Sequence, residues 1–122
     1  MFIKIDFSLS QPIFEQVASQ IKFAIAAGTV QANEMIPSVR ELSRQLTINP
    51  NTVARAYRLL HDEGFLSVRR GMGLAVAEGA EEICKKERKA FFEKKFQSFL
   101  DEAERSRVSI EELDEIISSY KQ

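Results

Sequence analysis

The feature that most constrains this chain is a short segment with helix signals at both ends, NPNTVARAYRLLHDEGF, from Asn49 to Phe65. Pro50 disfavours helical geometry at the residue before it, so Asn49 can act as the N-cap and Pro50 as the first helical residue. Gly64 predicts the end of the helix, because glycine accepts the left-handed geometry of a C-terminal cap. The segment therefore predicts a short helix with well-defined ends.

The two sides of this helix differ in chemistry. Apolar side chains recur with helical period on one side, at Val53, Ala56, Tyr57 and Leu60. The opposite side carries Asn51, Arg55 and Arg58. The apolar side predicts burial against other helices, which leaves a polar, cationic side for a partner.

The segments around this helix predict a small domain. Apolar residues every four positions from Ile13 to Ile25 predict a helix that Gly28 ends. Ser38 and Glu41 fit the capping box of a second, short helix. Residues 65–69 and 74–77 predict two strands joined by a glycine turn. Helix, short helix, tight turn, helix and hairpin make a winged helix-turn-helix, which we predict for residues 1–77.

Residues 78–122 have a different character, and we predict that they form a helical dimerisation tail. Aromatic residues follow helical spacing in the first part, and Ser109 with Glu112 fits a capping box for a second helix. Two helices beside a small domain cannot bury so many rings internally. We therefore predict a homodimer with an interface at Phe92, Phe96, Phe99, Leu113 and Ile117. The fold class is mainly α with a small β-hairpin.

Composition excludes several function classes. The 122 residues suit one domain with a small appendage, and no apolar run approaches the ~20 residues of a membrane span. Cys84 is the single cysteine, which excludes an internal disulfide or a multi-thiolate metal site. No catalytic or metal-ligating constellation is evident. We therefore expect a cytoplasmic protein that is not an enzyme, with no cofactor, no metal and no membrane partner.

The charge is distributed unevenly. The net charge is −1, yet residues 37–77 contain six arginines against three acids. Arginine has the planar fork that suits phosphates and base edges. A major groove ~12 Å wide accepts one helix, and the N-terminal end of a recognition helix carries most base contacts. These features predict that the helix after Asn49 reads double-stranded DNA.

The segments from 36 to 76 also resemble the N-terminal domain of the GntR family of bacterial transcription regulators. The resemblance lies in PSVREL from Pro37, NPNTVARAY from Asn49, EGFL from Glu63 and RRGMG from Arg69, in this order. The short tail is similar to the YtrA branch, whose members end in two dimerisation helices. Met72 stands where the family's wing often has lysine.

The resemblance implies a set of DNA contacts and a mode of action. The implied contacts are Ser38, Arg40, Asn49, Asn51, Thr52, Arg55, Arg70 and Gly71. We expect a homodimeric repressor in which two winged domains read the two halves of an inverted-repeat operator. A small-molecule effector could change the spacing between the two recognition helices, but the sequence names none.

Two other functions remain open at this point. A winged helix can serve as a protein interaction module without DNA binding, and a net charge near zero is compatible with that function. The chain could also be a fragment of an aminotransferase-fused regulator, although its tail ends in a capped helix with a complete apolar seam.

Overall fold

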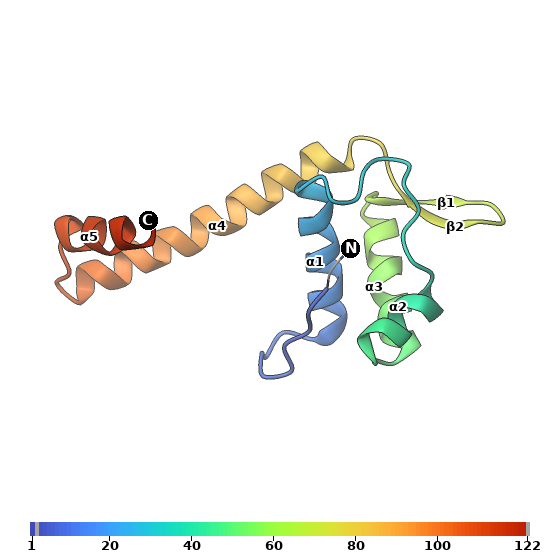
Figure 1. The fold of residues 1–122 in the computed structure, drawn as a ribbon, viewed down its shortest axis with the longest axis horizontal. Helices are drawn as coiled ribbons and strands as arrows, with labels where there is room; N and C mark the ends of the chain where they lie inside the picture. The colour runs from blue at the N-terminus through green and yellow to red at the C-terminus, as the bar shows by residue number, and fades with distance from the viewer. Residues whose placement is uncertain (2, 122) are drawn as a thin grey trace. The chain divides into compact units, whose positions relative to one another are not determined.

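The computed structural model describes residues 1 and 3–121 (Figure 1). Within them, five helices and one two-stranded antiparallel sheet follow one another. The elements are α1 (Ile13–Ala26), α2 (Val39–Leu46), α3 (Pro50–Asp62), β1 (Leu66–Arg69), β2 (Gly73–Val76), α4 (Ala80–Arg105) and α5 (Ile110–Tyr120). The mainly helical fold with a small hairpin is confirmed. The chain divides into two compact units, Met1–Arg88 and Lys89–Gln122.

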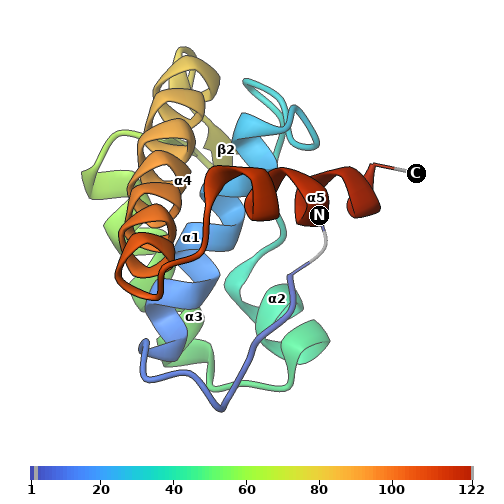
Figure 2. The same cartoon turned by 90° about the vertical axis from the view of Figure 1, so that its left-hand side faces the viewer.

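The core of the first unit lies where α1 and α3 pack side by side (Figures 1 and 2). Their apolar stripes meet, so Ile21, Ile25, Val53 and Leu60 are completely buried. Leu42 of α2 joins the same cluster. Each such side chain contributes roughly 1.5–3 kcal/mol when it is fully buried. The core therefore fixes the back of α3, as the sequence predicts.

An extended N-terminal segment runs antiparallel to α1 in both views (Figures 1 and 2). Two glutamines one helical turn apart bind its backbone in place of a neighbouring strand. Gln16 accepts from the amide of Asp6 at 3.0 Å and donates to the Asp6 carbonyl at 3.0 Å. Gln20 makes the same pair of hydrogen bonds with the backbone of Lys4. This pairing satisfies backbone groups that would otherwise rely on water.

The turn between α2 and α3 is held by local hydrogen bonds. Ser38 and Glu41 form the expected capping box at the start of α2. Thr47 ends α2 in the left-handed conformation, at φ 54°. Asn49 then caps α3, and its side-chain oxygen accepts from the amide of Asn51 at 2.8 Å. These contacts set the position at which α3 begins.

The wing consists of β1, β2 and the turn at residues 70–72. Leu66 pairs with Val76 at its base, and Arg69 pairs with Gly73 near its tip. The segment 34–36 lies along the other edge of β2, through a bridge between Met35 and Ala75. The amide of Ile36 donates to the carbonyl of Leu74 at 3.0 Å. The sequence pattern did not predict this third segment.

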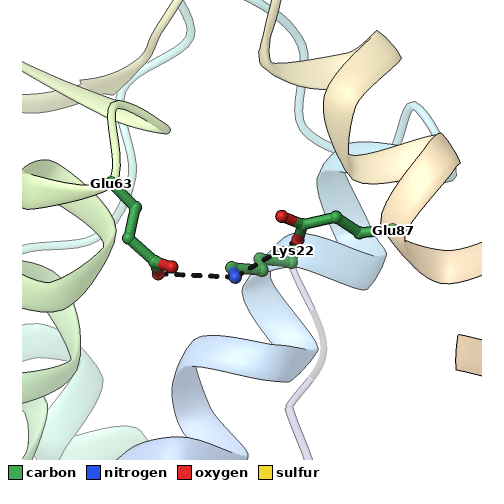
Figure 3. A network of polar contacts seen from close by, with 3 residues as sticks. All are labelled: Lys22, Glu63 and Glu87. Carbon is green, nitrogen blue, oxygen red and sulfur yellow. Dashed lines mark hydrogen bonds and ion pairs between the residues drawn. The ribbon is translucent and has the colours of Figure 1, made fainter.

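Lys22 of α1 joins two other parts of the first unit (Figure 3). Its Nζ lies 3.4 Å from Glu63, just after α3, and 3.3 Å from Glu87 of α4. The same nitrogen lies 4.7 Å from the centre of the Phe65 ring. The lysine thus links the end of α3 to the first turns of α4.

The second unit contains the rest of α4 and the whole of α5. Ser109 caps α5 and accepts from the amide of Glu112 at 3.2 Å. Among the described residues of this unit, 89–121, only Ala103 and Leu113 are buried. Aromatic and aliphatic side chains are exposed along both helices, at Phe91, Phe92, Phe96, Phe99, Ile110, Ile116, Ile117 and Tyr120. The unit therefore has almost no core of its own.

Candidate nucleic-acid interface

The start of α3 presents a short row of polar groups. Asn51 is exposed in the first turn, and Thr52 beside it is half-buried. Asn49 is exposed but already uses its side-chain oxygen as the cap of α3. The side-chain nitrogen of Asn49 remains a donor, so the same residue can cap the helix and still contact a partner. No acid lies in the first turn of α3, which leaves the positive end of the helix dipole uncompensated there.

Arg55 lies one turn further along α3 and is exposed. Its guanidinium carbon lies 3.8 Å from the centre of the Phe14 ring of α1. Arg58 is also exposed. The sequence analysis predicted the exposure of both arginines but not the contact with Phe14, because the aromatic ring belongs to a distant helix.

Tyr57 points in the opposite direction, as predicted, and is 3% exposed. Its hydroxyl donates to the carbonyl oxygen of Pro37 at 2.7 Å, just before α2. Burial, with a smaller contribution from the charge of Glu41, raises the pKa of this hydroxyl far above its ordinary value. The hydroxyl therefore stays protonated and ties α3 to the start of α2.

The start of α2 contributes Ser38 and Arg40, and both are exposed. The Ser38 hydroxyl accepts from the Glu41 amide at 3.1 Å, and the Glu41 carboxylate accepts from the Ser38 amide at 3.0 Å. Hydrogen bonds from the backbone and then the side chain of Ser38 lower the pKa of Glu41. The hydroxyl oxygen of Ser38 thus serves as an acceptor in the capping box while the residue stays exposed, and Arg40 is exposed two residues further on.

The two wing arginines differ in their contacts. Arg69 donates to the side-chain oxygen of Asn33, and the side-chain nitrogen of Asn33 donates to Glu78 at 3.2 Å. Arg70 is exposed and makes no ion pair or side-chain hydrogen bond with any residue the structure describes. Gly71 follows at the tip with φ 77°, a conformation that favours glycine. Met72 beside it is 72% exposed.

A groove of about 350 Å³ shows that the start of α2 and the wing lie close together. Ser38 and Glu41 line it on one side, Met72 and Gly73 on the other, and Tyr57 contributes from α3. Of the predicted contact residues, only Ser38 is among the residues that line this groove. Arg55 is not among the lining residues of this groove and instead contacts Phe14 of α1.

The described residues contain neither a cluster of three side chains suited to a metal nor a helix long and apolar enough to cross a membrane. Cys84 is 2% exposed, and burial raises the pKa of its thiol to about 11. The thiol is therefore protonated at neutral pH and unsuited to nucleophilic chemistry.

Comparisons with known proteins agree with this arrangement. The gntR family of bacterial regulatory proteins matches residues 13–76. The HTH-type transcriptional repressor YtrA of Bacillus subtilis (strain 168) is 33% identical over 115 residues, which cover 94% of this chain and 88% of that protein. A crystal structure of a transcriptional regulator from Oenococcus oeni is 26% identical and has a TM-score of 0.76, over 99% of this chain and 100% of that one. The structure of AraR(DBD) in complex with operator ORX1 is 28% identical and has a TM-score of 0.56, over 63% and 96% of the two chains.

The buried back of α3, its exposed polar side and the wing beside α2 define a winged helix-turn-helix DNA-binding transcription regulator. The chain belongs to the gntR family of bacterial regulatory proteins. The resemblance noted in the sequence is thereby confirmed.

Proposed function

We propose that the chain is a homodimeric repressor that binds an inverted-repeat operator in the cytoplasm. The observation that carries this proposal is the division of α3 between a back that is completely buried at Val53 and Leu60 and a front that exposes Asn51 and Arg55. A helix fixed in this way can enter a major groove without rearranging its own domain. Relatives such as YtrA of Bacillus subtilis are named as repressors, which supports the sign of regulation.

The proposed DNA contacts divide into three groups. Asn51, Thr52 and Arg55 would read base edges from α3, since asparagine pairs well with adenine and arginine with guanine. Asn49 would add a contact from its amide nitrogen. Ser38 and Arg40 at α2 would hold the DNA backbone, and Arg70 with Gly71 at the tip of the wing would approach a phosphate or a minor groove.

The second unit supports the proposed homodimer. A unit of fewer than about 40 residues seldom folds on its own and usually needs oligomerisation. Phe96 and Phe99 stack with their ring centres 6.3 Å apart and remain 54% and 51% exposed. Phe92 lies one helical turn before Phe96 on α4 and is 54% exposed, and Ile117 of α5 is 43% exposed. A second copy would cover this surface and give the two-fold symmetry that an inverted repeat requires.

Leu113 has a different place in this proposal. It is 8% exposed and already buried within its own unit. It would pack beneath the interface residues of its own chain and contact the partner over only a small area.

A titration of DNA binding against salt concentration tests the function. The probe is the duplex that the unaltered chain enriches most from a random-sequence DNA pool, and an inverted repeat in that duplex is the expected result. Log affinity should fall with log salt by ~0.9 for each phosphate neutralised. Arg55→Ala should weaken binding by about 1–3 kcal/mol and relax the preference at one base pair.

The matched control is Arg105→Ala, which removes an equal charge from an exposed position in α4. It should leave both affinity and base preference unchanged. Failure to enrich any duplex, or binding that is independent of salt, would favour a protein interaction module and refute the DNA contacts.

Sedimentation equilibrium tests the dimer. Phe96→Glu should give a monomeric or unfolded chain, because it places a charge inside an apolar interface. The control Lys94→Glu also introduces a carboxylate, but on the opposite side of α4, and should remain dimeric. A folded dimer with Phe96→Glu would place the interface elsewhere.

A further inference from the structure

Arg55 is the one exposed arginine of α3 that rests on an aromatic ring among the described residues. Its guanidinium carbon lies 3.8 Å from the centre of the Phe14 ring. This separation equals the contact distance of two flat groups of carbon atoms. The guanidinium therefore lies over the ring at van der Waals contact distance.

This contact with the ring is compatible with hydrogen bonding by Arg55. A guanidinium donates only within its own plane, whereas a ring contacts it from above. Within the described residues, Arg55 forms no hydrogen bond or ion pair that would occupy these donors. Arg55 can therefore still present two parallel donors to a guanine edge.

Phe14 is itself held in place by the domain core. It lies in the first turn of α1, where it is half-buried and packs against the core cluster. Val17 of the same helix is completely buried. The core therefore holds the ring in place, and the exposed Arg55 side chain packs against it.

We propose that Phe14 is a positioning residue for DNA recognition, which orders the Arg55 side chain before DNA arrives and sharpens the discrimination of the base pair that Arg55 reads. This inference rests on the proposed DNA contact of Arg55. An arginine that is already ordered loses less rotamer freedom on binding, and each such side chain accounts for roughly a two- to tenfold factor in affinity.

The experiment compares three variants of the full chain on the enriched duplex and on the same duplex altered at the base pair where Arg55→Ala loses discrimination. Phe14→Leu keeps an apolar side chain in the core but removes the aromatic face. Phe14→Tyr keeps that face and serves as the matched control. Phe14→Leu combined with Arg55→Ala completes a double-mutant cycle. Circular dichroism and thermal unfolding establish the folded fraction of each variant.

Phe14→Leu should bind the enriched duplex roughly two- to tenfold more weakly and should lose discrimination at that base pair by a similar factor. Phe14→Tyr should retain both, and Phe14→Leu should have no further effect once Arg55 is alanine. A merely structural defect lowers the active fraction of protein but leaves the ratio of the affinities for the enriched and the altered duplex unchanged. If Phe14→Leu leaves that ratio unchanged, the proposal is overturned.

The proposed function and this inference fail separately. If Arg55→Ala loses discrimination while Phe14→Leu keeps it, Arg55 contacts DNA without the help of Phe14. If Arg55→Ala has no effect, the contact itself is wrong and the positioning role falls with it.

Discussion

Removal of the Tyr57 hydroxyl measures how strongly α3 is tied to the start of α2. The side chain is 3% exposed, and its hydroxyl donates to the Pro37 carbonyl at 2.7 Å. A hydrogen bond of this kind contributes a net ~0.5–1.5 kcal/mol, and an acceptor left unsatisfied in the interior costs ~1–3 kcal/mol. Pro37 is half-buried and lines a groove open to solvent, so water can replace part of the lost bond. We therefore expect Tyr57→Phe to lower the free energy of unfolding by about 1–1.5 kcal/mol.

Urea unfolding at a fixed protein concentration measures this loss, because a dimer's stability depends on concentration. Tyr120→Phe is the matched control, since the only other tyrosine is 84% exposed. The control should unfold like the unaltered chain. If Tyr57→Phe also does so at pH 7, the hydroxyl does not hold the two helices together.

The pH dependence gives a second, independent measurement. Burial raises the pKa of Tyr57 in the folded state above its ordinary value of 10.0. Its stabilising contribution is therefore complete below pH 10 and is lost as the pH rises towards the folded-state pKa. The stability difference between the unaltered chain and Tyr57→Phe should narrow by about 1.4 kcal/mol for each pH unit above 10 and vanish near pH 11. A difference that stays constant over this interval would contradict the assigned burial.

Two further predictions concern the first unit. Lys22→Met should lower the free energy of unfolding by about 1 kcal/mol at low salt, because its side chain is 22% exposed and bridges Glu63 and Glu87 (Figure 3). The loss should shrink in 1 M salt, where screening extends only ~3 Å, and a loss independent of salt would show that packing dominates. Cys84 should resist a thiol reagent at pH 8 in the native chain, because it is 2% exposed and its pKa is raised to about 11. Labelling that is equally fast with and without denaturant would refute this burial.

The bounds of α3 follow from local signals, and these are the features that sequence predicts best. Pro50 fixes where the helix begins, and Gly64, with φ 88°, lies just beyond its end. The pairing of Met35 with Ala75 has no such signal, because an edge segment of three residues shows no alternation that would distinguish it from a loop. The direction in which Arg55 points was equally hidden, since the ring that holds it belongs to α1.

The contacts of Arg69 and Arg70 change the contribution that we expect from the wing. Sequence alone places two adjacent arginines before the glycine turn, but neighbouring residues near the end of a strand point to opposite faces. Arg69 donates a hydrogen bond to Asn33, which ties the last residue of β1 to the loop before the segment 34–36. Arg70 is then the arginine that is exposed at the tip, near the apolar Met72. On the proposed function, the wing adds the electrostatic attraction of about one phosphate contact, and base discrimination has to come from the start of α3.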